Sequence, residues 1–264
     1  MNYIVTQFKN EKPRIKEWIE FHFKNGFDKI LIYLDGPTDG SDEIVKELAD
    51  KNGNLMFFYA QNSLNINYAT ANDYWGNERF ISCLRENYFY GLDYIKRNFR
   101  ICRDDWVAFI DVDEFLVQTG AYDLNTFLQR IDNKINRIYL TSYDMKCPLD
   151  LSKSVVQQSL YRWSDETRNN SIFISRGKSM SRIMDLYKID CVHCLDSNKQ
   201  FNPSHKNIVM SSGGLLDKRA NDVIIDVYHD QEYFKLFHYR NHALHQVYDQ
   251  YDDSALKMLW NMII

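Results

Sequence analysis

The first sixty residues alternate between short apolar runs and amphipathic segments, and this alternation constrains the fold more than any other feature of the chain. Three runs, residues 3–8, 29–34 and 55–59, have the length and composition of buried strands. After the first run, apolar residues recur at three- and four-residue spacing and stop near Gly26, which suits the end of a helix. A second helix is expected to begin at Ser41. Such a β-α-β-α-β series predicts a parallel sheet covered by helices.

The rest of the chain extends this pattern less regularly. Helices are expected over residues 78–98 and 123–131, and a strand over 137–142. Alternation over residues 155–163 predicts an edge strand, and residues 172–174 and 181–187 are further short apolar runs. A C-terminal helix is expected to carry a stripe made of Tyr248, Tyr251, Leu256, Leu259 and Trp260. The expected fold class is therefore α/β, with a mostly parallel central sheet flanked by helices.

The strongest chemical signal is an apolar run that ends in three carboxylates. Residues 106–110, Trp-Val-Ala-Phe-Ile, have the pattern of a strand buried on both faces, and Asp111, Asp113 and Glu114 follow it. Buried carboxylates are costly unless a cation meets them. Because residues two apart in an extended segment point the same way, Asp111 and Asp113 can present their oxygens to one hard cation. The alternative is a solvated acidic turn, and aspartates turned apart or plugged by a lysine, with no open hollow beside them, would argue against a shared cation.

A parallel sheet also predicts where a ligand binds. The carboxyl ends of the strands meet at one edge, so residues 6–11, 35–39 and 111–114 are expected to converge there. The chain lacks the glycine-rich loops that bind dinucleotides or the phosphates of ATP. Asp35 can instead accept a hydrogen bond from a base N–H or a ribose hydroxyl, although it equally suits the start of a tight turn. Arg85 is close enough to this edge to reach a phosphate, or else it faces solvent.

Composition and charge exclude other classes of protein. The 264 residues carry 32 Lys and Arg against 36 Asp and Glu, so no basic face is indicated and nucleic acid is not expected as a partner. Five cysteines without framework spacing, and no signal-peptide pattern at the start, favour a cytoplasmic protein. The chain has no run of eighteen apolar residues, so the sequence does not predict a membrane span. The apolar residues 259–264 suit a packed helix, a truncated chain or peripheral attachment at the inner face of a membrane.

Several segments, taken in order, resemble a known family. The matching segments are residues 8–11, 17–22, 26, 32–36, 39–41, 106–116, 178–182 with His193, and 237–240. Together they look like the GT-A glycosyltransferases grouped around family 92 and its family 2-like bacterial relatives, and residues 106–116 resemble that group's W-x-A-F-I-D-x-D-E-F block. The later matches are similar to a strand that starts with lysine and leads to a histidine, and to a late His-Tyr pair. Leu140-Thr141-Ser142 stands where the group has Phe-Gly-Ser.

The resemblance implies one GT-A (Rossmann-like) domain over residues 1–264. Residues 1–117 would form the half that binds a nucleotide sugar, and residues 118–264 the acceptor side with the C-terminal helix. The implied reaction transfers a sugar from a nucleotide diphosphate, with UDP favoured, to a hydroxyl of a glycan or lipid-linked acceptor, as in polysaccharide biosynthesis. Inversion at the anomeric carbon is expected. A divalent ion would stabilise the charge that develops on the departing diphosphate.

Roles follow by position from the same resemblance. Asp111 and Asp113 would hold or orient Mn²⁺ or Mg²⁺, and His238 would complete the coordination, since an imidazole favours Mn²⁺. Glu114 would position the site. The residues implied to bind the nucleotide sugar are Thr6, Phe8, Asn10, Glu11, Asp35, Arg85, Asp111 and Val112.

The sequence does not decide between two candidates for the residue that takes the proton of the acceptor hydroxyl, and it leaves two alternative functions to consider. Asp144 and His193 are the candidates for the catalytic base, and His193 equally suits a structural histidine. A GT-A-like module that binds a nucleotide or carbohydrate without catalysis is the first alternative, and the intact Asp111, Asp113 and His238 disfavour it. A metal-dependent phosphoryl hydrolase is the second, and it is disfavoured because no further carboxylates cluster to hold a second metal.

Overall fold

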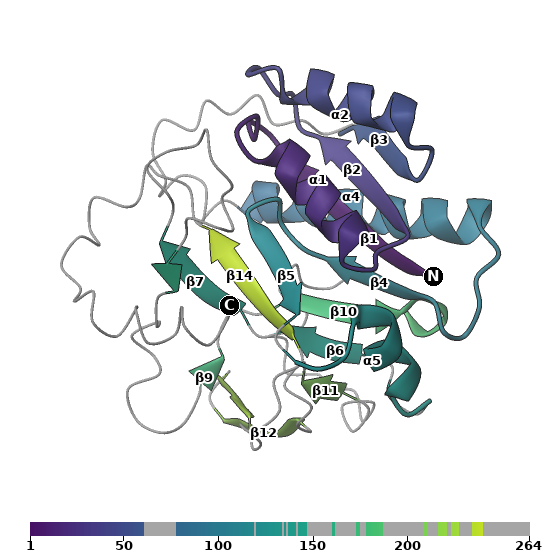
Figure 1. The fold of residues 1–264 in the computed structure, drawn as a ribbon, viewed down its shortest axis with the longest axis vertical. Coiled ribbons are helices and arrows are strands. Elements are labelled where there is room, and N and C mark those ends of the chain that lie inside the picture. Colours follow the sequence, from purple (N-terminus) through teal and green to yellow (C-terminus); the bar gives the residue numbers. More distant parts are fainter. Residues whose placement is uncertain are drawn as a thin grey trace.

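The computed structural model of the chain describes residues 1–60, 78–118, 120–133, 135, 137–140, 142–146, 160–161, 173–174, 178–186, 208–210, 216–220, 223–226 and 234–239. Its centre is a seven-stranded sheet with the strand order β11-β6-β10-β4-β1-β2-β3. Helices cover both faces of this sheet, and a second sheet lies alongside it (Figure 1). The expected α/β class is confirmed.

Four parallel strands make up the part of the central sheet that positions the candidate site. They are β1 (Asn2–Phe8), β2 (Lys29–Leu34), β3 (Leu55–Tyr59) and β4 (Trp106–Phe109). β1 pairs in parallel with β2 on one side and with β4 on the other, and β2 pairs in parallel with β3. Their carboxyl ends meet at one edge of the sheet, which we call the carboxyl edge, and ligands of parallel sheets bind at this edge.

The other half of the central sheet contains its one antiparallel strand. β10 (Lys178–Arg182) runs antiparallel between β4 and β6 (Arg137–Leu140), and β11 (Ile208–Met210) pairs in parallel with β6. Six of the seven strands therefore run in the same direction, which confirms the mostly parallel sheet. Because β10 is reversed, its first residue, Lys178, lies at the carboxyl edge.

The helices form layers on the two faces of the sheet (Figure 1). They are α1 (Ile15–Lys24), α2 (Ser41–Lys51), α4 (Glu78–Asn98) and α5 (Leu124–Arg130). Ile4 of β1 shares an apolar cluster with Trp18 of α1 and Val45 of α2, whereas Val5 shares another with Leu92 of α4. Successive strand residues point to opposite faces, so one apolar run serves both layers. None of the described helices is both long enough and apolar enough to cross a membrane.

α4 approaches β1 closely because of Gly91. A Cβ atom at this position would lie 2.5 Å from Cγ1 of Val5, so only glycine fits without a shift of its neighbours. Asn87 is one helical turn before Gly91, and Gln7 is two residues after Val5 on the same face of β1. The close contact therefore brings Asn87 to Gln7 at the carboxyl edge.

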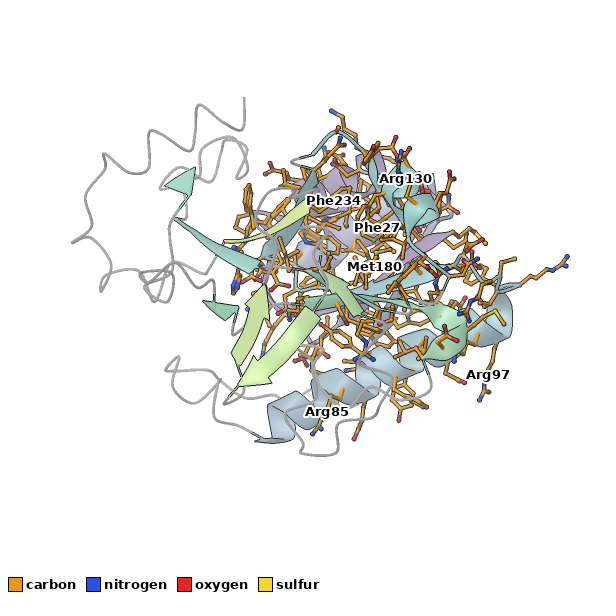
Figure 2. All side chains as sticks on the ribbon, turned by 90° about the horizontal axis from the view of Figure 1, so that it is seen from below. Phe27, Arg85, Arg97, Arg130, Met180 and Phe234 are labelled. Atoms are coloured by element: carbon orange, nitrogen blue, oxygen red, sulfur yellow. The ribbon has the colours of Figure 1, made fainter. Side chains whose placement is uncertain are left out.

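A four-stranded sheet brings the later part of the chain to the same region. It is formed by β5 (Glu114–Gln118), β14 (Phe234–Tyr239), β7 (Ser142–Lys146) and β8 (Leu160–Tyr161). β14 pairs antiparallel with β5 and parallel with β7, which sets His238 opposite Glu114 on one side and opposite Asp144 on the other. Phe234 of β14 and Met180 of β10 both lie in the interior (Figure 2). The third sheet contains β12 (Leu216–Ala220), β13 (Val223–Asp226) and β9 (Phe173–Ile174).

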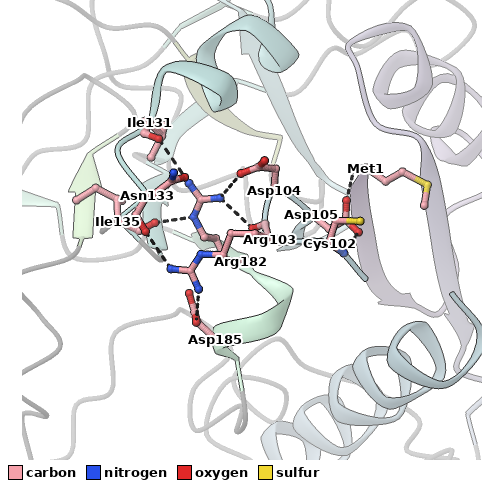
Figure 3. Close-up of polar contacts among 10 residues, drawn as sticks. All are labelled: Met1, Cys102, Arg103, Asp104, Asp105, Ile131, Asn133, Ile135, Arg182 and Asp185. Carbon is pink, nitrogen blue, oxygen red and sulfur yellow. Dashed lines mark hydrogen bonds and ion pairs between the residues drawn. The ribbon is translucent and has the colours of Figure 1, made fainter. Parts of the chain in front are cut away.

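A buried arginine fixes the far end of β10 (Figure 3). Arg182 donates from Nε to the carbonyl oxygen of Ile135 at 2.8 Å, and from Nη1 to the carbonyl oxygen of Arg103 and to Asp104 Oδ1, each at 3.0 Å. Its guanidinium also lies 4.4 Å from the centre of the Trp106 ring, a cation–π contact. These contacts tie β10 to the segment before β4 and so set the register in which Lys178 reaches the carboxyl edge.

The strand expected over residues 106–110 is confirmed as β4, which ends at Phe109, and β5 begins at Glu114 in a different sheet. The apolar run 181–187 contains the end of β10 and a 3₁₀ helix over Ile183–Asp185. The expected C-terminal helix, His193 and most of the expected strand 155–163 lie outside the described residues.

Candidate functional site

The acidic block forms a tight turn between β4 and β5. Glu114 N donates to the carbonyl oxygen of Asp111 at 3.0 Å, which closes the turn. The Glu114 side chain folds back, and its Oε2 accepts from Asp111 N at 2.8 Å. Glu114 is only 2% exposed and Val112 is also buried, whereas Asp111 and Asp113 are partly exposed. The two aspartates are thus presented by a turn and not by the extended segment that the sequence suggested.

Asp111 is held by two side chains from other elements. Lys178 Nζ lies 2.7 Å from Asp111 Oδ2 and 3.7 Å from Glu114 Oε2, and Lys178 is 1% exposed. Tyr88 of α4 donates its hydroxyl to Asp111 Oδ1 at 3.0 Å. Both carboxylate oxygens of Asp111 therefore have partners within the protein. A lysine bound to one of the aspartates was expected to argue against a cation shared by both, and the contact of Lys178 with Asp111 is such a lysine.

Asp113 faces a different partner. Its Oδ2 lies 3.3 Å from His238 Nε2, because the pairing of β14 with β5 carries His238 beside the turn. These two residues are 125 positions apart in the sequence, and the fold brings together this part of the implied metal site. Asp111 and Asp113 point to separate partners, Lys178 and His238.

The pair Asp113 and His238 fits a divalent ion in part. Ligands of Mg²⁺ bind at about 2.1 Å, so neighbouring ligands of an octahedral ion are roughly 3 Å apart, close to the separation of these two atoms. Such ions usually take one or two protein ligands and complete their coordination with substrate phosphates and water. Among the described residues no three His, Cys, Asp or Glu side chains form a closed metal site. The pair therefore suits an open site that a diphosphate would complete.

The turn has an unusual electrostatic pattern. Burial raises the pKa of Glu114 to about 7, with Lys178 opposing this shift and Asp111 adding to it. Burial also raises the pKa of Asp113, but His238, with Arg14 and Lys178, outweighs this effect and lowers the pKa to about 2. At neutral pH Asp113 is therefore an anion, while Glu114 is partly protonated and lies beneath the turn.

A second ion pair borders the turn. Arg14 is buried and donates to Glu11 Oε2 from Nε at 2.9 Å and from Nη2 at 2.6 Å. Burial raises the pKa of Glu11 to about 7, although Arg14 opposes the shift, and Asp113 adds to it. Arg14 also helps to lower the pKa of Asp113. Glu11 and Arg14 thus lie close enough to the acidic turn to share its electrostatic field.

The residues after β1 and β2 meet at the carboxyl edge, as the strand order requires. Asp35 N donates to the carbonyl oxygen of Phe8 at 2.8 Å, and Thr38 N donates to Asn10 Oδ1 at 2.8 Å. Thr6 is fully buried, and its hydroxyl has no hydrogen-bond partner in the described part of the chain. The fold therefore gathers these predicted nucleotide-binding residues along two adjacent strand ends.

The remaining predicted site residues are less closely placed. Arg85 lies on the α4 surface and is partly exposed (Figure 2). Asp144 lies in β7, in register with His238 of β14. His193 lies outside the described residues. Asp144 is thus one strand from the acidic turn at the level of the backbone.

No protein-family model matches the chain, and no curated protein matches it. Among solved structures, the chain is similar to a crystal structure of GalNAc-T7 with UDP, GalNAc and Mn²⁺. The identity is 9% and the TM-score is 0.45, with 91% of this chain covered. The chain spans 44% of the length of that protein. A likeness at this level does not establish a reaction.

Sequence reasoning gave no individual role in the site to five residues that shape it, Gln7, Arg14, Asn87, Tyr88 and Lys178. Gln7 falls within the range 6–11 expected at the sheet edge, Tyr88 was expected on the apolar side of the helix over 78–98, and Lys178 was noted as the start of a strand. A buried polar residue inside an apolar strand or helix stripe is the one signal that could have indicated Gln7 and Asn87. Arg14 and Lys178 carry no such signal, because their neighbours come from distant parts of the chain.

Proposed function

We propose that this protein is a metal-dependent glycosyltransferase that moves a sugar from a nucleotide diphosphate to a hydroxyl group. One observation carries the proposal. Asp113, which follows β4, lies 3.3 Å from His238 of β14 and at the same sheet edge as Asp35, whose buried Oδ1 lacks a partner among the described residues. A cation-binding pair and an unsatisfied acceptor at one edge are what a diphosphate joined to a nucleoside requires.

The acidic turn would handle the diphosphate. Asp113 and His238 would hold Mn²⁺ or Mg²⁺, which when bound supplies positive charge where the departing diphosphate becomes more negative. Asp111 would orient this arrangement, since Lys178 and Tyr88 hold both of its oxygens. The buried ammonium of Lys178 adds fixed positive charge beneath the turn and needs no reorganisation during the reaction.

The first two strand ends would bind the nucleoside. The carboxylate of Asp35 and the hydroxyl of Thr6 are buried and would bind a base or a ribose. Asn10 and Glu11, at the same edge of the sheet, are further proposed contacts. The other proposed contacts to the nucleotide sugar are Phe8, Arg85, Asp111 and Val112. UDP is the nucleotide we favour.

Asp144 and His193 are the proposed bases for the acceptor hydroxyl in an inverting reaction, and Asp144 has the support of its register beside His238. We place the whole reaction in one domain over residues 1–264, acting in the cytoplasm on a glycan or on a lipid-linked acceptor at the inner face of a membrane.

The metal test compares nucleotide binding with and without Mn²⁺. Calorimetry should show that Mn²⁺ strengthens UDP binding to the wild-type protein by at least about tenfold. Asp113→Asn and His238→Ala should each lose this dependence and the Mn²⁺-dependent hydrolysis of a UDP sugar, because each removes one of the two protein ligands. Asp50→Asn, an exposed residue of α2, is the matched control and should behave like the wild type.

Two results would contradict the proposal. Failure of every common nucleoside diphosphate to bind, with or without Mn²⁺, would remove the donor site. Retained Mn²⁺ dependence in both variants, each folded as judged by circular dichroism, would remove the metal role from this pair.

A binding module without catalysis is a second candidate. The contact between Lys178 and Asp111 favours it, because a lysine that neutralises Asp111 reduces the need for a metal. Under this alternative, UDP would bind equally well in EDTA and no nucleotide sugar would be hydrolysed. The same calorimetry and hydrolysis measurements therefore separate the two candidates.

A further inference from the structure

Three buried polar side chains from three elements form a hydrogen-bonded chain at the carboxyl edge. They are Asn87 of α4, Gln7 of β1 and Asp35 after β2, with exposures of 2%, 9% and 4%. Asn87 Nδ2 donates to Gln7 Oε1 at 2.8 Å, and Gln7 Nε2 donates to Asp35 Oδ2 at 3.3 Å. Burying three polar groups is costly unless each is well partnered, so their arrangement needs an explanation.

The carboxylate fixes the direction of the chain. An ionised carboxylate can only accept hydrogen bonds, whereas each amide has one accepting oxygen and one donating nitrogen. Gln7 must therefore turn its nitrogen toward Asp35 and its oxygen toward Asn87. Asn87 must in turn present its nitrogen. Reversing either amide would set an oxygen against an oxygen, so the polarity of all three groups is determined by Asp35.

The chain ends at an unsatisfied acceptor. Asp35 Oδ1 is buried and has no hydrogen-bond partner within the described residues. Leaving such an oxygen unpaired is costly, and a hydrogen-bond donor on a bound ligand would remove this cost. Because Gln7 donates to Oδ2, Oδ1 is the oxygen of this carboxylate that lacks a partner among the described residues, and the contact with Gln7 helps to fix its direction.

A single fixed acceptor distinguishes nucleobases by their chemistry. Uracil and guanine carry an N–H in the ring on their pairing edge, whereas cytosine and adenine present a bare ring nitrogen at the same place. An ionised carboxylate attracts the first kind and repels the second. A buried group made to pair with a ligand N–H rejects an analogue that lacks it, because the group is then left unpaired.

We propose that Asn87 and Gln7 are positioning residues that make the donor site select a nucleobase with a ring N–H. This inference rests on the proposed function, since it concerns the nucleotide of the sugar donor. Gly91 completes the arrangement, because the missing side chain lets α4 approach Val5 and so brings Asn87 to Gln7. Base selection is thereby built into the packing of α4 on β1.

The test reverses the direction of the hydrogen bonds that link Asn87, Gln7 and Asp35. In Asn87→Asp, the new carboxylate accepts from Gln7 Nε2, which turns Gln7 Oε1 against Asp35 and displaces it. Calorimetry with UDP and CDP in Mn²⁺ should show that the wild type prefers UDP by about tenfold or more, the value of about one hydrogen bond. The ratio of the two affinities should fall about tenfold in Asn87→Asp. Asn98→Asp, an exposed residue of the same helix, is the matched control and should keep the wild-type ratio.

A second variant guards against loss of the fold. Asn87→Leu is close in size, removes the donor and leaves Gln7 free to turn, so the ratio of UDP to CDP affinity should also fall. A merely structural role of Asn87 would weaken both ligands together and leave the ratio unchanged, which would overturn the inference. Preference of the wild type for CDP or ADP would overturn it as well. If no nucleoside diphosphate binds the wild type, the proposed function fails first, and this result is distinct from an unchanged ratio.

Discussion

At the scale of single residues, Lys178 is the side chain on which the acidic turn most depends. Its ammonium is 2.7 Å from Asp111 and 3.7 Å from Glu114, and water does not reach it. A buried charge that loses its partner is strongly destabilising, whereas exposed ion pairs contribute little. Lys178 therefore stabilises the turn by compensating two carboxylates at once.

Replacing Lys178 by methionine should lower the free energy of unfolding by about 3–5 kcal/mol, since two carboxylates lose their cation. Urea denaturation followed by circular dichroism measures this difference. Lys51→Met is the matched control, because Lys51 forms an exposed pair with Glu47, and it should change stability by less than about 1 kcal/mol. Equal effects of the two substitutions would show that the buried contact does not stabilise the turn.

At the scale of secondary-structure elements, the packing of α4 against β1 decides the geometry of the carboxyl edge. α4 supplies Tyr88 to Asp111, which follows β4, and Asn87 to Gln7, which lies within β1. Gly91, one turn later, sets the distance between helix and sheet. One helix thus controls both the acidic turn and the buried chain that ends at Asp35.

Gly91→Ala should destabilise the protein and loosen this geometry. The added Cβ would lie 2.5 Å from Val5 Cγ1, a contact that forces a shift and costs about 1–3 kcal/mol, partly offset by the higher helix propensity of alanine. Urea denaturation should show a loss of stability, and Val5→Ala in the same chain should restore part of it. Gly53→Ala, with nothing within 4 Å of the added atom, is the control and should be nearly neutral.

The elements also show where sequence reasoning succeeds and where it stops. The bounds of β2, β3 and α4 match the predicted ranges, because each is a regular apolar pattern that local spacing determines. The strand before the acidic block was predicted over residues 106–110, close to the bounds of β4, but β5 after the block was not predicted. β5 depends on a pairing partner, β14, that lies more than a hundred residues away.

At the scale of the whole molecule, the candidate site is assembled from segments far apart in the sequence. The residues that meet around one turn are Glu11, Arg14, Tyr88, Asp111–Glu114, Lys178 and His238. The family resemblance predicted that Asp113 and His238 lie close together. The partners of Asp111 could not be predicted, because hydrophobic periodicity does not show which lysine the antiparallel strand β10 places beside it. The same assembly concentrates buried acids in one place, and the whole protein should therefore respond to pH.

Stability should decrease as pH rises from about 4.5 to 7. Burial raises the pKa of both Glu11 and Glu114 to about 7 from an ordinary 4.5. A group with a raised pKa in the folded state contributes its full stability below the unfolded pKa and loses it as pH passes through the folded pKa. Asp113, whose pKa is lowered to about 2, acts only at the acidic end, where stability is lost as pH falls. The melting temperature should thus be highest near pH 4–5.

Thermal unfolding at pH 4.5, 6 and 7.5 measures this dependence, and a loss of about 1 kcal/mol corresponds to roughly 2–4 °C in a domain of this size. Glu11→Gln keeps an oxygen for Arg14 but cannot ionise, so it should flatten the decline toward neutral pH. Glu43→Gln, on the exposed start of α2, should leave the decline as in the wild type. A melting temperature that rises steadily to pH 7.5 would show that the two acids are ionised at little cost in the folded protein, and that Arg14 and Lys178 outweigh their burial.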